Sequence, residues 1–535
     1  MSKVKKKIAE SSSFNLLGVY LTFIFGIFNT FLIARLLLPE EWAIVILSLS
    51  IVFIFTFFCN LFPPNAHETI QYYLPHLKSN EGDNTLEIRY FIYHVYKIRF
   101  LSTIIVLISL ICFIFLANFN PKLSYIFFAI SPSVVFYILK NLNNSILLAF
   151  QKFKRVFINN VINPLIVATC LIIIYIYQLK DPLVLVIYTY LLGAIISCIV
   201  SIFLIIHVIP FKSKDMKIKI SFKKKFINIH KKYGIFLTMS EIFLQLSSLI
   251  IYLLFLNFDV IIFITYLTIC EISVTSALLF SSSDPQSYIS IFSEINYKKD
   301  PKTYEENFYK LNKFLMLFVC IIVGIMIFFI EIYITVIYSQ RYLVVLIFIQ
   351  IILFSAFSKI VVRNLFIITQ STEKTIINAK ITFIQMIISI LSAIFALLFF
   401  GFLTLILLLL VGSFLLPFIA VHLINKKSDL KLKSIIFFKP FFVFLLSFII
   451  VFPFYYFVNF QIIPQIYLLN VFINNAIKFL LFTFVFYIIL YYSRLITKQE
   501  FNQLIEIIPI LRSKNKIIQK VKILIEKLLP SEKLK

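Results

Sequence analysis

The stretch Val208–Gly234, VIPFKSKDMKIKISFKKKFINIHKKYG, carries nine lysines and lies between two long apolar regions. It divides the chain into two halves with similar patterns of apolar segments and loops. We interpret this lysine run as a basic connection at the membrane surface that joins two membrane-embedded lobes.

Composition places the chain among membrane proteins. Apolar residues make up 61% of the 535 residues and charged residues 14%, and the mean hydropathy is +0.99. An average soluble domain has about 45–50% apolar and about 25% charged residues. The first apolar segment, 14–38, is too long for a signal-peptide core and lacks an Ala-x-Ala-type cleavage site, so we expect a retained first span.

Segments of about 20 apolar residues, the length that crosses a bilayer as a helix, recur along the chain. They predict an all-α polytopic membrane protein with about 14 transmembrane helices. The expected spans are 14–35, 43–62, 98–119, 125–148, 157–178, 183–207, 233–255, 260–281, 314–333, 343–367, 376–400, 402–423, 436–457 and 469–491.

The net charge of +26 could indicate nucleic-acid binding, but its distribution favours membrane lipids as partners. When the spans are threaded, nearly all Lys and Arg residues fall on one side, as the positive-inside rule requires of cytoplasmic loops. We therefore expect a multi-pass protein of the cell (plasma or inner) membrane with both termini cytoplasmic and no nucleic-acid partner. Four basic residues fall on the other side: Arg35, Lys122, Lys180 and Arg341.

The two halves predict a duplication. Pro64 and Pro285 each follow an even-numbered span. The separation between these two prolines along the chain is nearly the same as the separation between Asn160 and Asn378. Apolar helices of equal length could imitate a period by chance, but similar loops are harder to obtain that way. Copies with the same orientation should be parallel repeats with a central site between them. The expected domains are an N-terminal six-helix lobe (1–207), a basic inter-lobe loop (208–232), a C-terminal six-helix lobe (233–425), two extra helices (426–492) and a basic cytoplasmic tail (493–535).

Cations inside the predicted spans are the candidate site. Lys140 and Asn144 share one helical face of the fourth span, and Lys359 and Arg363 lie at the equivalent place in the second half. A charge near the bilayer centre costs about 2.5–3.5 kcal/mol and therefore needs a partner or a wet cavity. We expect these groups to bind an anionic substrate such as a phosphate or pyrophosphate. Alternatively, Lys140 pairs with a carboxylate and the other two cations follow the positive-inside rule.

Three more charges remain open. Glu241 and Glu271, on the seventh and eighth spans, could pair with a lysine or bind a coupling H+ or Na+. Arg35, late in the first span, could anchor at headgroups or close the outer side of a cavity and contribute to the phosphate site. We expect Lys478, on the last span, to make a packing or lipid contact.

Enzymatic chemistry is not expected. The six histidines and six cysteines show no metal-ligand spacing, so we predict no metal site, no cofactor and no catalytic residue. No segment outside the membrane is long enough for a catalytic domain.

An ordered series of segments resembles a known family. It comprises LLGVYLTFIFGIFNTFLIARLLLPEEWAIVILSLSIV, YYLPHLKS, LLAFQKFKRVFINNVINPL, DPQSYISIFSEI with YEENFYKLNKF, and EIYITVIYSQRYLVV. Together they resemble the polysaccharide flippases, the Wzx-like branch of the multidrug/oligosaccharidyl-lipid/polysaccharide exporter superfamily, over residues 5 to 500. The sequence departs from the family pattern at Trp42-Ala43, Ile264-Thr265-Tyr266 and Ser339-Gln340.

The resemblance implies two six-helix lobes that form a V, with two added C-terminal helices and alternating access. It also implies a flippase that moves a polyprenyl-(pyro)phosphate-linked oligosaccharide to the outer leaflet for cell-surface polysaccharide biosynthesis, with other glycan-assembly membrane proteins as further partners. In such flippases cavity-lining cations bind the lipid phosphates, and Arg35 matches an arginine usual late in the first span. The alternative is a cation-coupled multidrug antiporter of the same superfamily, in which Glu241 carries the coupling ion. A membrane scaffold for glycan assembly is a third interpretation.

Overall fold

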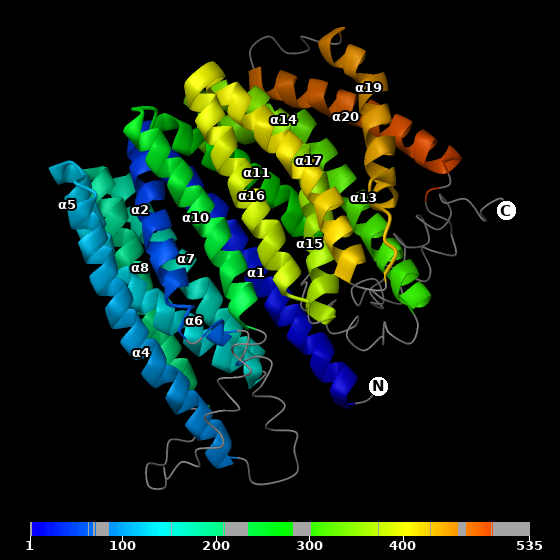
Figure 1. Ribbon diagram of the computed structural model, residues 1–535. Coiled ribbons are helices and arrows are strands. Elements are labelled where there is room, and N and C mark those ends of the chain that lie inside the picture. Colours follow the sequence, from blue (N-terminus) through cyan, green and yellow to red (C-terminus); the bar gives the residue numbers. More distant parts are fainter. Residues whose placement is uncertain are drawn as a thin grey trace. The chain divides into compact units, whose positions relative to one another are not determined.

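The computed structural model describes residues 3–62, 64–67, 70, 85–150, 152–206, 208, 234–281, 301–372, 374–427, 430–457, 467–493 and 495. These residues are almost entirely helical, with one isolated bridge between Leu61 and Pro64 (Figure 1). The predicted all-α class is therefore confirmed. Nearly all of the lysine run, most of the loop that follows the second span and nearly all of the predicted tail lie outside the described residues.

The described helices group into two compact units. The first covers 1–268, 337–339 and 378–405, and the second covers 269–336, 340–377 and 406–535. Helices of the first unit, in chain order, are α1 (Lys3–Leu36), α2 (Pro39–Phe58), α4 (Thr85–Leu116), α5 (Pro121–Ile130), α6 (Ser133–Ala149), α7 (Phe153–Tyr177), α8 (Pro182–Ile206), α10 (Ile235–Asn257), and most of α16 (Ile376–Phe395) with η4 (Ala396–Phe400).

The second unit contains most of the remaining helices. They are most of α11 (Ile262–Ser281), α13 (Pro301–Tyr333), η3 (Gln340–Val345), α14 (Leu346–Leu353), α15 (Ser355–Ser371), most of α17 (Gly401–Lys427), α18 (Ser434–Phe437), α19 (Lys439–Phe457) and α20 (Tyr467–Tyr492); the short η2 (Ile334–Tyr338) is divided between the two units. The predicted division into repeat-related lobes stays a prediction, and α10, which the sequence assigns to the C-terminal lobe, packs against α2 in the first unit.

Each of the fourteen predicted spans coincides with an apolar helix. Among the described residues, ten helices are long and apolar enough to cross a membrane. The predicted tenth span is a helix pair, α14 with η3 and α15, bent by 46° at Phe354. The remaining three predicted spans coincide with shorter apolar helices: Tyr20–Leu36, Ile262–Leu278 and Lys439–Pro453.

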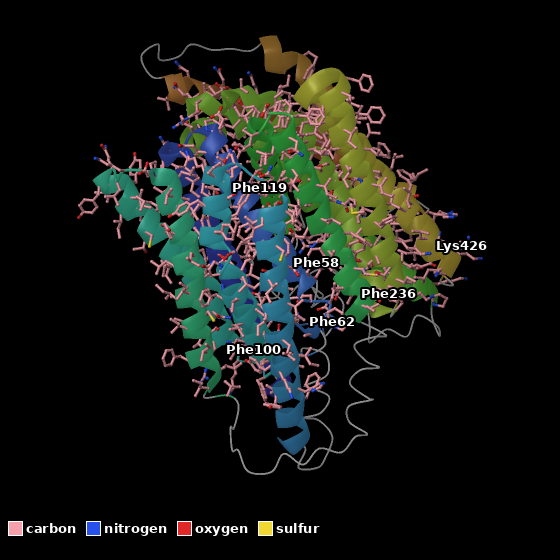
Figure 2. All side chains as sticks on the ribbon, turned by 60° about the vertical axis from the view of Figure 1, so that its left-hand side comes forward. Phe58, Phe62, Phe100, Phe119, Phe236 and Lys426 are labelled. Carbon is pink, nitrogen blue, oxygen red and sulfur yellow. The ribbon has the colours of Figure 1, made fainter. Side chains whose placement is uncertain are left out.

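The outward faces of these helices are apolar, as a lipid environment requires. Phe100 on α4 is 63% exposed and Phe62, just beyond α2, is 66% exposed. Figure 2 shows side chains projecting outward from α4, Phe100 among them. Such a surface would be unusual on a soluble protein, where large contiguous apolar patches are rare.

Short turns with Asn, Asp and Pro join the helices at one end. The Asn120 side chain accepts a hydrogen bond from the Leu123 amide at 2.8 Å, and Pro121 occupies the first turn of α5. Asp181 and Asp259 have φ angles of 54° and 55°, a left-handed conformation that these residues tolerate because their short polar side chains bond locally. The connections at Asn120-Pro121, Asp181-Pro182 and Asn257-Phe258-Asp259 are thus tight turns.

Proline in α7 creates a polar contact with α1. Pro164 has no amide hydrogen, so the Asn160 carbonyl one turn earlier lacks its intrahelical donor. The Thr22 hydroxyl lies 3.5 Å from that carbonyl, and the Asn29 amide donates to the Pro164 carbonyl at 3.1 Å. These side-chain contacts join α1 to α7, as polar side chains often do between membrane helices.

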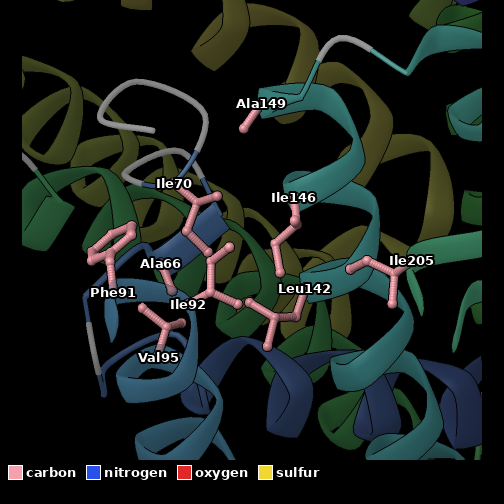
Figure 3. Packing of buried hydrophobic residues seen from close by; sticks show 9 residues of the cluster. All are labelled: Ala66, Ile70, Phe91, Ile92, Val95, Leu142, Ile146, Ala149 and Ile205. Atoms are coloured by element: carbon pink, nitrogen blue, oxygen red, sulfur yellow. The ribbon is translucent and has the colours of Figure 1, made fainter. Parts of the chain in front are cut away.

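A small apolar cluster holds the segment that follows α2. Ala66 and Ile70 are fully buried against Phe91, Ile92 and Val95 of α4, Leu142, Ile146 and Ala149 of α6, and Ile205 of α8 (Figure 3). This packing fixes the chain around His67 beside the end of α2.

The other end of α2 is anchored separately. Pro39 begins the helix, and the Glu41 carboxylate accepts a hydrogen bond from the Leu38 amide at 3.1 Å. The Thr265 hydroxyl donates to the Pro39 carbonyl at 2.6 Å. Trp42, one turn further on, is buried and stacks on Tyr338 with ring centroids 5.9 Å apart. Both ends of α2 are therefore held by contacts far away in the sequence.

Candidate functional site

The first unit contains a cavity of about 310 Å³ between α2, α6 and α10. It lies beside the C-terminal halves of α2 and α6 and the N-terminal half of α10. Aromatic rings, hydroxyls, amides, a histidine and one carboxylate line it: Phe53, Thr56, Phe57, Asn60, His67, Tyr137, Asn141, Asn144, Ser145 and Glu241. By the predicted topology these helix ends face the cytoplasm.

Asparagines on α6 tie that wall of the cavity to its neighbours. The Asn144 amide donates to the Asn160 side chain at 3.2 Å and accepts from Asn159 at 3.1 Å. One residue earlier, Asn143 donates to Ser201 of α8 at 2.7 Å. These buried bonds fix the rotation of α6, so that Asn141, Asn144 and Ser145 line the cavity together.

Arg99 is the fully buried charge next to the cavity. It comes from α4 and donates to the Cys59 carbonyl and, at 2.7 Å, to the Asn60 side-chain oxygen. Cys59 caps the C-terminus of α2, where carbonyls lack helical partners and a cation is favoured. Glu241 lies near enough for its charge to attract Arg99. This opposite charge offsets part of the cost of burying the guanidinium.

Backbone contacts close α10 onto the end of α2. The Thr238 hydroxyl lies 3.3 Å from the Asn60 carbonyl and donates to the Gly234 carbonyl at 3.0 Å. A Cβ at Gly234 would lie only 2.4 Å from the Pro64 carbonyl oxygen, so this approach requires glycine. We call these contacts of Gly234 and Thr238 with Asn60 and Pro64 the α2–α10 latch.

His67 is a neutral group in the cavity wall. Its Nδ1 lies 3.2 Å from the Ser145 hydroxyl. Burial, and secondly the positive charge of Arg99, lower the pKa of His67 to about 3. The ring is therefore uncharged at physiological pH and acts as a hydrogen-bonding group.

Lys140, the first predicted phosphate ligand, is 9% exposed on α6. It does not line the cavity, whereas Asn144 one turn later does. Lys140 lies toward Cys198 of α8, and no hydrogen bond or ion pair to it is found in the part of the chain that the structure describes. The predicted pairing with a carboxylate is not seen among those residues.

The equivalent cations lie on α15 in the second unit. Lys359 lies near enough to Glu271 of α11 for their charges to attract, which agrees with the paired interpretation of Glu271. Asn364, beside Arg363, donates to the Asn312 side chain at 2.8 Å. A cavity shared by Lys140 and Lys359 stays a prediction.

Arg35 and Lys478, two further cations singled out in the sequence, each have a neighbour that interacts with the positive charge. The Arg35 guanidinium lies 4.4 Å from the centre of the Phe31 ring, a cation–π geometry. Lys478 is 5% exposed on α20, where Glu331 attracts its charge. It is therefore buried within the protein, which fits the packing alternative of the expected packing or lipid contact.

Sequence analysis did not identify Arg99 as a buried charge, because Arg99 falls at the start of the predicted third span. The helix begins earlier, at Thr85, so Arg99 lies well inside it. A signal was present, because Phe91, Val95 and Arg99 follow one another at a spacing of four residues and therefore share one helical face. The burial of Phe91 and Val95 implies the burial of Arg99.

Comparison with solved structures identifies the fold. The chain is similar to the lipid II flippase MurJ in an inward closed conformation, with a TM-score of 0.63, 16% identity, and coverage of 88% of this chain and 98% of that one. It is also similar to an inward-facing MATE-family multidrug resistance transporter of the MOP superfamily (0.62, 10% identity, 76% and 94% covered). A MOP-superfamily transporter from Pyrococcus furiosus matches at 0.58 with 11% identity over 79% and 95%.

Neither a protein-family profile nor a curated protein sequence matches this chain. The chain thus has the fold of MOP-superfamily transporters, the superfamily that its sequence resembles. The similar structures include both a flippase and a drug transporter.

Proposed function

We propose that this protein is a flippase that moves a polyprenyl-(pyro)phosphate-linked oligosaccharide from the cytoplasmic to the outer leaflet of the cell membrane by alternating access, for cell-surface polysaccharide biosynthesis. The MOP-superfamily fold supports a transporter, and the lipid II flippase MurJ is a solved structure with this fold that handles a lipid-linked substrate. The Wzx-like resemblance of the sequence supports a glycan as cargo. Other glycan-assembly membrane proteins are the expected partners.

Lys140 is the observation that carries this proposal. A lysine buried within a membrane helix bundle costs several kcal/mol unless something offsets its charge, and no ion pair offsets it in the described part of the chain. An anionic cargo would supply the missing charge. Asn144, Lys359, Arg363 and Arg35 are proposed to complete the phosphate-binding set over the transport cycle.

A translocation assay tests the proposal. The purified chain is placed in vesicles with a radiolabelled prenyl-pyrophosphate glycan, and wild type is compared with Lys140→Ala combined with Lys359→Ala. Removing cations that bind a desolvated phosphate should slow transport at least about tenfold, because truncating such a partner costs about 2–5 kcal/mol. Lys478→Ala is the matched control, since Lys478 is a buried lysine outside the proposed set. An unchanged rate in the folded double variant would show that these lysines do not bind the phosphate.

A cation-coupled multidrug antiporter is the second candidate, because Glu241 lines the cavity. A coupling carboxylate must gain and lose a proton or a sodium ion during the cycle. The nearby positive charge of Arg99 would compete with such an ion for Glu241. Efflux of the cationic dye ethidium that is abolished by Glu241→Gln, without any glycan transport, would favour the antiporter.

A further inference from the structure

The cavity between α2, α6 and α10 has the chemistry of a site for an uncharged polyol. Its polar groups are amides, hydroxyls and a neutral histidine, and its one carboxylate, Glu241, lies near the positive Arg99. A phosphate would need a cation that is not already engaged with protein groups. A cationic ligand would compete with Arg99 for Glu241.

Several of these polar groups remain able to bind a ligand. Asn141 is exposed to the cavity, and no hydrogen bond to its side chain is found in the described part of the chain. Arg99 occupies the side-chain oxygen of Asn60, so the Asn60 NH2 group is left as a donor. His67 uses Nδ1 toward Ser145 and keeps Nε2. Donors and acceptors are thus both present, as a row of hydroxyl groups requires.

Aromatic rings supply the opposite chemistry. Phe53 of α2 is 39% exposed, and its ring centre lies 5.7 Å from that of Tyr137 with the planes tilted by 44°. Phe53 thus leaves part of its side chain accessible, and it lines the same cavity as the amides. The C–H face of a pyranose ring can pack against such a surface while its hydroxyls bond to the amides, since aromatic side chains combine large apolar area with defined geometry.

We propose that this cavity binds a sugar ring of the cargo. This inference rests on the proposed flippase function and deepens it. The volume of about 310 Å³ lies at the lower end of the roughly 300–1,000 Å³ of small-molecule sites, which suits one or two rings and not a whole glycan. Lys140 and Asn144 are four residues apart, about 6 Å along α6. Lys140 is thus about one helical turn from Asn144 in the cavity wall, a short distance compared with a pyrophosphate joined to one sugar.

Binding of short synthetic lipids to the full chain in nanodiscs, measured by native mass spectrometry, tests this site. The probes are bare farnesyl pyrophosphate and farnesyl pyrophosphates carrying glucose, galactose or N-acetylglucosamine. The wild type should bind at least one glycosylated lipid about tenfold or more tightly than the bare lipid. Asn141→Ala and Phe53→Leu should each reduce that preference about tenfold and leave binding of the bare lipid unchanged. Phe100→Leu, the same exchange on the outer face of α4, should change neither.

Three outcomes would overturn the sugar site: equal binding of bare and glycosylated lipids by the wild type, an unchanged preference in both variants, or equal weakening of both lipids. Loss of ethidium binding in the two variants, without an effect on the lipids, would assign the cavity to a cationic ligand. If no lipid binds at all, the proposed function fails together with this inference. If bare lipid binds through Lys140 but sugar adds nothing, only the sugar site fails.

Discussion

Replacing Gly234 with alanine measures how firmly the α2–α10 latch is closed. Gly234 has helical φ and ψ angles of −74° and −34°, so alanine causes no backbone strain there. Its Cβ, however, would lie 2.4 Å from the Pro64 carbonyl oxygen and 3.0 Å from the carbonyl carbon. Both contacts are to backbone, which cannot rotate away as a side chain can.

The two segments must therefore separate by roughly half an ångström or more, and overpacking of this kind costs about 1–3 kcal/mol. If opening of the latch relieves the clash, a cost of about 2 kcal/mol shifts the closed–open equilibrium roughly 30-fold. Thr238 is fully buried in the latch, so a thiol at this position reports opening.

The assay is the rate at which N-ethylmaleimide labels the Thr238→Cys variant. Five native cysteines are replaced, and the buried Cys320 of the second unit is retained as a reporter of global unfolding. Adding Gly234→Ala should accelerate labelling of the thiol in the latch about 10- to 30-fold without labelling Cys320. Gly26→Ala is the matched control, because a Cβ there meets nothing within 4 Å. An unchanged rate in a folded Gly234→Ala protein would refute the reasoning, since the closed contact would then tolerate a Cβ.

Three further results are expected. Arg99→Met should destabilise the protein by about 3–5 kcal/mol, because it removes the guanidinium that donates to the Cys59 carbonyl and to the Asn60 side chain and whose charge attracts Glu241; a melting temperature in detergent equal to wild type would contradict this. His67 has a pKa of about 3 in the folded protein against 6.5 in a model peptide, so the unfolded chain binds more protons between these values and stability falls as pH drops below 6.5. His67→Gln should flatten the dependence of melting temperature on pH between 6.5 and 4, and an identical slope would exclude this origin. Asn364→Leu should cost about 1–3 kcal/mol by leaving the buried Asn312 side chain without its donor, whereas the double exchange of both asparagines to leucine should be less destabilising than the single one, as a double-mutant cycle would measure.

Hydrophobic length predicted the fold well because a bilayer leaves few alternatives to an apolar helix. All fourteen segments are found as apolar helices, with ends that differ by a few residues or more. The largest shifts occur where an amphipathic helix runs into a span, as in α4 (Thr85–Leu116) and α13 (Pro301–Tyr333). Hydropathy marks only the part of such helices that is uniformly apolar.

The site was harder to predict because hydropathy does not tell which charge a helix buries. Lys140 was identified from its depth in the span, and its burial agrees with that reasoning. The cavity next to it depends on Asn60, His67 and Glu241, which come from distant parts of the chain. Their meeting follows from the packing of α10 against α2, for which the sequence carries no local signal.

Trp42 gives the protein an intrinsic optical probe at the end of α2 remote from the latch. It is the single tryptophan of the chain, and its indole is buried against Tyr338 close to the bond between Thr265 and Pro39. Indole emission depends on solvation and on contacts with neighbouring rings. A conformational change at that end of α2 should therefore shift the fluorescence spectrum of the unlabelled wild-type protein. Motion caused by cargo binding can then be followed in real time.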